Sequence, residues 1–222
     1  IPSALVWDLH QTFENSITLD VINDIQFKNL MEKNGISNDS TIILYGDEDN
    51  RSATYAFWVF KYYRHNSVKI LDGSIKKWKN DGNIIDFEND ISGRQKIQTK
   101  SNYEVKNPDL TIRITKDQIL KNIENFSIID VRTFDEFLGK SDGISTAIEG
   151  DSIRRRGRIP GAKHLEWTQL LNDDGTFKSI DKISEIVRQK NIVDSEEIIT
   201  YCRLGVRASY VWFALKYLLG FS

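Results

Sequence analysis

Six residues near the C-terminus, Cys202 to Arg207, combine one thiol with two arginines and a glycine. The apolar, β-branched residues before them predict a buried strand, and the periodic apolar residues after them predict a helix. In such a strand, loop and helix unit, the backbone N–H groups of the loop and the positive end of the helix stabilise an anion at one point. We therefore expect Cys202 to ionise more readily than a free thiol, because Arg203 and Arg207 add positive charge there.

A lone cysteine beside a strand is more often a small core residue than a nucleophile. That alternative leaves the two arginines and Gly205 unexplained, so we favour a reactive thiol. Because the sequence has one cysteine, an internal disulfide is impossible and no second thiol can resolve an oxidised Cys202. The histidines His10, His65 and His164 do not lie at metal-ligand spacing, so we expect no metal site.

The chain has 222 residues and a net charge of −2, with acidic and basic residues interspersed. This pattern argues against a nucleic-acid or membrane-surface partner. The sequence shows no apolar run of membrane-spanning length and no charged-then-apolar signal at its start. We therefore expect no nucleic-acid and no membrane partner. The use of a single cysteine favours a reducing, cytoplasmic location.

Two pairs of segments repeat at nearly the same offset. The residues IPSA at 1–4 match IPGA at 159–162, and IILYGDEDNRSATYAF from residue 42 matches IITYCRLGVRASYVWF from residue 198. The offsets are 158 (159 − 1) and 156 (198 − 42) residues, so we infer an internal duplication. At the position of Cys202 the first copy has Gly46, followed by acidic residues 47–49. We therefore expect the first copy to be catalytically inactive.

Strands alternate with helices in both copies, which predicts an α/β fold with a mainly parallel sheet flanked by helices on both faces. In the first copy we expect helices at 22–33, 53–63 and 74–80 and strands at 41–45 and 68–71. In the second copy we expect helices at 115–123 and 183–190 and after residue 207, a turn and short helix at 132–138, and strands at 127–131 and 198–201.

The domain boundaries follow from this pattern. We place the first domain at residues 1–83 and the second, catalytic domain at residues 113–222. Residues 84–112 are polar and weakly periodic, which is typical of a linker. Each copy lacks an element that the other has at one end, so we expect native residues to be missing before Ile1 and after Ser222.

Four motifs resemble the two-domain rhodanese family, the thiosulfate and 3-mercaptopyruvate sulfurtransferases. They are IIDVRTFDEFLGK from residue 128, GRIPGAKHLEW from 157, YCRLGVRAS from 201 and ILDGSIKKW from 70. The resemblance covers nearly the whole chain, including an inactive first copy. It implies tandem rhodanese-like domains and no cofactor.

The resemblance also implies a mechanism, in which Cys202 attacks the outer sulfur of a small anionic donor, holds it as a persulfide, and passes it to cyanide or a thiol. The implied substrate-binding residues of the loop are Arg203, Leu204, Gly205, Val206 and Arg207. Arg203 favours thiosulfate as the donor, because thiosulfate-type members resemble CRKGVT and mercaptopyruvate-type members resemble CG-G-T. Leu204 and Arg207 depart from the lysine and threonine of the thiosulfate type.

Two further pairs of residues come from the other motifs. Arg155 and Arg156 precede the Gly-x-Ile-Pro-Gly element, where family members resembling LRRGHIPGA place substrate-binding arginines; the alternative is a solvated basic run. Asp130 and Arg132 lie at the carboxyl end of a predicted strand, near the edge where α/β sites assemble. A structural ion pair that fixes the loop explains both residues better than substrate binding does.

Three other functions stay open. A 3-mercaptopyruvate sulfurtransferase differs in its donor, and a sulfur carrier or regulatory module would hold the persulfide for a protein sulfur acceptor. A Cys-dependent phosphatase also holds a thiolate in an anion-binding loop, but phosphatases resemble Cys-x5-Arg. Here Arg207 is five residues after Cys202 (207 − 202 = 5). The shorter loop suits one sulfur atom better than a phosphate, so we favour a thiosulfate sulfurtransferase.

Overall fold

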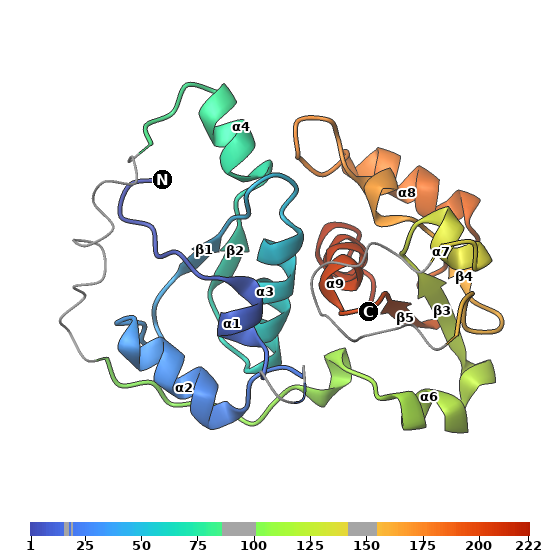
Figure 1. Cartoon of the computed structure of the whole chain (residues 1–222), viewed down its shortest axis with the longest axis horizontal. Helices are drawn as coiled ribbons and strands as arrows, with labels where there is room; N and C mark the ends of the chain where they lie inside the picture. Colours follow the sequence, from blue (N-terminus) through green and yellow to red (C-terminus); the bar gives the residue numbers. More distant parts are fainter. Residues whose placement is uncertain (16–17, 19, 86–100, 142–154) are drawn as a thin grey trace. The chain divides into compact units, whose positions relative to one another are not determined.

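The computed structural model describes residues 1–15, 18, 20–85, 101–141 and 155–222. The chain divides into two compact units (Figure 1). The first unit contains residues 1–113 and 174–176, and the second contains residues 114–173 and 177–222. Residues 101–112, the described end of the predicted linker, therefore belong to the first unit, whereas residues 86–100 lie outside the described part. The boundaries at 83 and 112 stay a prediction.

The first unit contains a two-stranded parallel sheet with helices around it. Strands β1 (Ile42–Leu44) and β2 (Val68–Ile70) pair with Ile42 opposite Val68. The helices are α1 (Leu9–Phe13), α2 (Asp24–Lys33), α3 (Arg51–Tyr62), α4 (Ser74–Asn80) and a 3-10 turn at Leu110–Ile112. Except for α1 and the 3-10 turn, these elements were predicted from the apolar periodicity, with ends that differ by at most two residues.

Aromatic rings form much of the core of the first unit. The rings of Phe27 and Tyr63 stack at 4.5 Å, and Phe27 also packs edge-to-face with Phe60 and Tyr103. Tyr103 is 1% exposed and its hydroxyl lies 2.9 Å from Nδ1 of the buried His65. A residue predicted to be in the linker is thus part of this core.

The second unit contains a three-stranded, wholly parallel sheet in the order β4-β3-β5. The strands are β3 (Phe126–Asp130), β4 (Lys163–His164) and β5 (Glu197–Tyr201). The helices are α6 (Lys116–Lys121), α7 (Phe134–Leu138), α8 (Ile180–Gln189) and α9 (Val206–Phe213), with 3-10 turns at Ile123–Asn125 and Trp167–Leu170 and a π-helical turn at Ala214–Leu218. Asp130 is in register with both His164 and Tyr201, so three polar side chains meet at the carboxyl end of the sheet.

Successive residues of β3 point to opposite faces of the sheet, and both faces are covered. Ile129 packs into a cluster that includes Ile183 of α8 and Tyr210 of α9. Ile128 packs into a second cluster, against which Ile119 of α6 lies. The second unit thus has helices on both faces of a parallel sheet, which confirms the predicted fold class. Among the described residues, no helix combines the length and apolar character that crossing a membrane requires.

Candidate active site

Cys202 lies in the turn that leads from β5 into α9. It is half-buried, and its Sγ accepts the backbone N–H of Gly205 at 3.1 Å. Gly205 precedes α9 with a φ of 92°, a left-handed conformation that a glycine adopts without a steric penalty. The turn therefore points a backbone donor at the sulfur, which favours negative charge on that atom.

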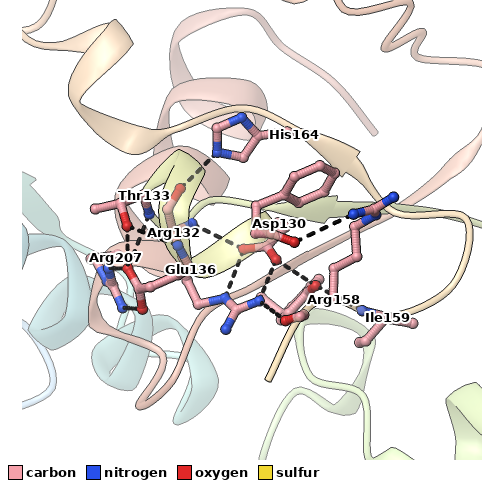
Figure 2. A network of polar contacts seen from close by, with 11 residues as sticks. Asp130, Arg132, Thr133, Glu136, Arg158, Ile159, His164 and Arg207 are labelled. Atoms are coloured by element: carbon pink, nitrogen blue, oxygen red, sulfur yellow. Dashed lines mark hydrogen bonds and ion pairs between the residues drawn. The ribbon is translucent and has the colours of Figure 1, made fainter. Parts of the chain in front are cut away.

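Arg207 lies in the first turn of α9, since the helix begins at Val206 rather than after the predicted loop. Its Nη1 and Nη2 donate to the two carboxylate oxygens of Glu136 at 2.6 and 3.0 Å. Glu136 comes from α7 and is 2% exposed. Figure 2 shows the carboxylate between Arg207 and Thr133. A bidentate contact of this kind fixes the plane of the guanidinium as well as its position.

Glu136 is itself held by the start of α7. Its Oε2 accepts both the backbone N–H and the hydroxyl of Thr133 at 3.0 Å, which completes a capping box. Burial alone would raise the pKa of Glu136, but hydrogen bonds from Arg207 and Thr133 and the charge of Arg207 outweigh burial and lower it to about 2. The carboxylate therefore stays ionised at neutral pH.

The groups around Arg207 favour its charged form. Burial lowers the pKa of Arg207, but the hydrogen bonds to Glu136, together with the charge and hydrogen bonding of Cys202, outweigh burial and raise it. The guanidinium thus binds a buried carboxylate at the start of the helix that follows the Cys202 turn. This arrangement can stabilise a thiolate or a persulfide anion on Cys202.

A second ion pair lies at the carboxyl end of β3. The side chain of Asp130 is 0% exposed and accepts the backbone N–H, Nε and Nη2 of Arg132, the last at 2.6 Å. It also accepts the hydroxyl of Tyr201 at 2.6 Å. Arg132 donates onward to the carbonyl of Gly157 at 2.7 Å, and the N–H of Ile159 donates to the Tyr201 oxygen at 3.1 Å. These contacts tie residues 157–159 to the strand ends (Figure 2).

The remaining predicted residues are placed less specifically. Arg203, Leu204 and Val206 are half-buried in the turn around Cys202. Arg155 and Arg156 are exposed. Their roles in substrate binding stay predictions. In the part of the chain that the structure describes, no three His, Cys, Asp or Glu side chains gather as a metal site requires.

Sequence reasoning did not identify Glu136 or His164 as part of this region. His164 Nε2 donates to the carbonyl of Arg132 at 2.8 Å, and its ring lies beside Phe137. The sequence signal for Glu136 is the Thr-x-x-Glu spacing from Thr133, which indicates a helix start. That spacing does not reveal the arginine that Glu136 binds.

The corresponding turn of the first unit has no thiol. Gly46, which aligns with Cys202 at the repeat offset, donates its N–H to Oδ1 of the buried Asn50 at 2.7 Å. Arg51, which aligns with Arg207, donates its Nε to Asp49 at 2.9 Å within its own turn. In this turn Asn50 and Asp49 thus accept the hydrogen bonds of Gly46 and Arg51. The position that corresponds to Cys202 holds no nucleophile.

Comparison with known proteins agrees with this geometry. Two segments, residues 5–81 and 115–222, match the family model described as a rhodanese-like domain. A "Putative thiosulfate sulfurtransferase" of Mycobacterium leprae is 38% identical over 100% of this chain and 78% of its own length, and one of Saccharopolyspora erythraea is 36% identical over 99% of this chain and 76% of its own length. The "Sulfur carrier protein TtuD" of Thermus thermophilus is 36% identical over 100% of this chain and 77% of its own length.

Solved structures show the same fold. The wild-type structure of EanB has a TM-score of 0.81 and 22% identity, and covers 100% of this chain. The anaerobic ergothioneine biosynthesis enzyme from Chlorobium limicola has a TM-score of 0.82, also at 22% identity. This chain spans about half the length of both, 54% and 55% respectively. With two matched segments and relatives at this level of identity over nearly its whole length, the chain belongs to the rhodanese family.

Proposed function

We propose that the chain is a sulfurtransferase that moves a sulfane sulfur from thiosulfate to a thiophilic acceptor through a persulfide on Cys202. The observation that supports this most directly is the Cys202 sulfur, which accepts the N–H of Gly205 in the turn before α9, the helix whose first turn holds the half-buried Arg207. The named thiosulfate sulfurtransferases among the relatives support the same reaction.

The reaction has two balanced steps. The Cys202 thiolate attacks the outer sulfur of thiosulfate, a new S–S bond forms, and sulfite leaves with the electron pair of the S–S bond that breaks. Cyanide or a thiolate then attacks the outer sulfur of the persulfide, and the Cys202 thiolate is restored. Because the enzyme alternates between two covalent forms, the steady-state kinetics should be ping-pong.

The choice of sulfur donor and of cellular compartment rests on fewer observations. Arg203, at the second position of the loop, favours thiosulfate over 3-mercaptopyruvate by resemblance to the thiosulfate type. Arg155 and Arg156 are further candidates for binding the donor anion. A reaction that needs a free thiol favours a reducing, cytoplasmic compartment.

A sulfur carrier is the second candidate. The relative from Thermus thermophilus that is named a sulfur carrier protein matches as much of this chain as the named sulfurtransferases do. A carrier would form the same persulfide and deliver its sulfur to a protein acceptor. A sulfurtransferase and a sulfur carrier therefore share the step that forms the persulfide, and they differ in how fast they turn over with small acceptors.

The test compares thiosulfate and 3-mercaptopyruvate as donors, with cyanide as the acceptor and thiocyanate as the measured product. We expect the higher kcat/KM with thiosulfate, no product with Cys202→Ser, and a mass increase of one sulfur atom on the intact chain after thiosulfate alone. A stable persulfide with negligible thiocyanate production would favour the carrier. Faster turnover of an aryl phosphate than of thiosulfate would contradict the proposal.

A further inference from the structure

The two terminal nitrogens of Arg207 are both engaged by one buried carboxylate. Nη1 and Nη2 each donate to a different oxygen of Glu136, and the Arg207 side chain is only 19% exposed. An arginine that bound the anionic sulfur donor by a bidentate contact would need this fork, the pair Nη1 and Nη2, for that substrate. In this chain the fork is turned to Glu136, and Arg207 lies in the first turn of α9, directly after the turn in which the Gly205 N–H donates to the Cys202 sulfur. The charge of Cys202 also helps to raise the pKa of Arg207.

We infer that Glu136 is a positioning residue that holds the Arg207 guanidinium against the Cys202 sulfur, so that Arg207 stabilises the sulfur that Cys202 holds rather than the anionic end of the donor. The inference rests on the proposed sulfur transfer and assigns a role to a residue outside the cysteine loop. It also changes the role expected of Arg207, from binding the donor to stabilising the sulfur anion.

The position of Glu136 is also held by a residue other than Arg207. Its Oε2 accepts two hydrogen bonds from Thr133, and the side chain is buried at the first turn of α7. A carboxylate held in this way offers its two oxygens in one plane. Because guanidinium is planar too, the bidentate contact permits one orientation of Arg207. The start of α7 thereby sets the geometry of the first turn of α9.

The simpler explanation is that Glu136 only caps α7. The chain offers a matched comparison in α6, where Thr115 and Gln118 form the same capping box. Gln118 Oε1 accepts the N–H of Thr115 at 2.8 Å and its hydroxyl at 2.9 Å. A glutamine therefore performs this capping role in the same protein. Glu136→Gln should keep the cap of α7 and change only the contact with Arg207.

Glu136→Gln removes the charge and one of the two acceptor oxygens. If the amide oxygen of the introduced glutamine keeps the hydrogen bonds from Thr133, its NH2 group faces Nη2 of Arg207. Both groups are hydrogen-bond donors, so this contact is lost. The guanidinium then loses its fixed position beside Cys202. We expect the alkylation of Cys202 by iodoacetamide at neutral pH to slow by about tenfold, with the midpoint of its pH profile moved upward. We expect kcat for thiosulfate to fall by a similar factor, with KM little changed.

Iodoacetamide reports on one site, because the chain has a single cysteine. Gln118→Ala, which breaks the equivalent cap of α6, should leave the alkylation profile as in the wild type. Arg207→Lys keeps a positive charge but cannot bind Glu136 through a fork, and should slow alkylation as Glu136→Gln does. In the double variant Glu136→Gln with Arg207→Gln, alkylation should be no slower than with Arg207→Gln alone, because Glu136 acts through Arg207.

Two results would overturn the inference. One is an increase in KM for thiosulfate in Glu136→Gln with an unchanged alkylation profile, which would make Arg207 a donor-binding residue. The other is additive loss in the double variant, which would make Glu136 independent of Arg207. Alkylation needs no sulfur donor, so absence of thiocyanate production by the wild type would refute the proposed function while the alkylation series still tests Glu136. If Glu136→Gln fails to fold by circular dichroism, Arg207→Lys decides the question.

Discussion

The ion pairs Arg132–Asp130 and Arg207–Glu136 differ from surface pairs because their carboxylates are buried. Asp130 is fully buried and Glu136 nearly so, and each accepts hydrogen bonds from a neighbour besides its arginine. Breaking a buried pair leaves an uncompensated charge, which costs far more than breaking a pair in water. The residues around the cysteine therefore contribute to stability as well as to chemistry.

Asp130→Asn tests the first of these pairs. The variant leaves Arg132 without a countercharge and weakens the acceptor of Tyr201, so we expect the free energy of unfolding to fall by about 3–5 kcal/mol. Urea denaturation followed by circular dichroism measures this. As a control, Asp81→Asn breaks an exposed contact with Lys77 at 2.9 Å, and should change stability little. Equal losses in the two variants would mean that Asp130 is not an important partner of Arg132.

The pKa of Glu136 predicts an acid dependence of stability. Burial acts to raise this pKa, but Arg207 and Thr133 lower it from 4.5 to about 2 in the folded chain. A carboxylate with a lowered folded pKa stabilises the fold above the unfolded value, and this contribution is lost as the pH falls through the folded value. The stability difference between the wild type and Glu136→Gln should therefore narrow between pH 4.5 and about 2. Thermal unfolding at several pH values checks this, and a constant difference would contradict it.

Part of this site was predictable from residue types and part was not. The sequence predicted a site at the cysteine loop because a thiol, two arginines and a glycine lie within a few residues of each other, and the role of this loop stays a prediction. Glu136 and Arg207 are 71 residues apart in the sequence, and neither apolar periodicity nor a capping motif says which distant charges will meet. The site roles of Arg155 and Arg156 stay predictions for the same reason.

At the scale of elements, periodicity predicted the longer helices and strands but not the short ones. Strand β4 has two residues, Lys163 and His164, which is too short to show an alternation of apolar and polar side chains. The start of α9 was expected after residue 207 but lies at Val206. That shift matters, because it places Arg207 on a helix, where its backbone is fixed by hydrogen bonds.

The end of α7 gives a prediction about how elements are held together. Gly139 ends α7 with a φ of 76°, and an added Cβ would lie 3.1 Å from the backbone N of Gly157. Gly139→Ala should therefore displace Gly157, whose carbonyl accepts a hydrogen bond from Arg132. This displacement costs stability in addition to the roughly 1–2 kcal/mol that an alanine in the left-handed conformation costs. We expect a larger loss of unfolding free energy than for Gly220→Ala, together with slower alkylation of Cys202.

Gly220 is the matched control for this experiment. It follows the C-terminal helix with a φ of 75°, and an added Cβ would meet no other described atom within 4 Å. Gly220→Ala thus incurs the same conformational cost without the clash. Equal destabilisation by the two variants would show that the approach to Gly157 is unimportant.

At the scale of the molecule, the sequence predicted a duplication because two segment pairs share nearly one offset, and the rhodanese-like domain model matches two segments of the chain. The extent of the first unit was harder to predict, because residues 101–113 are mostly polar. The contacts of these residues are made by single side chains, and no apolar periodicity in the sequence indicates them. The Trp58 indole N–H donates to the carbonyl of Ile112 at 3.0 Å, and Arg113 donates to Asp20 at 2.8 Å.

These contacts predict that the first unit needs more of the chain than the predicted domain of residues 1–83. A fragment of residues 1–83 lacks Tyr103, whose buried ring stacks on His65 and packs edge-to-face with Phe27. Removing a buried aromatic ring costs about 3–5 kcal/mol, a large part of the stability of a small domain. We therefore expect a fragment of residues 1–113 to give a cooperative thermal transition by circular dichroism, and residues 1–83 to give a weaker one or none. Tyr103→Ala in the longer fragment should reproduce most of that loss, whereas equal stability of the two fragments would favour a domain that ends at residue 83.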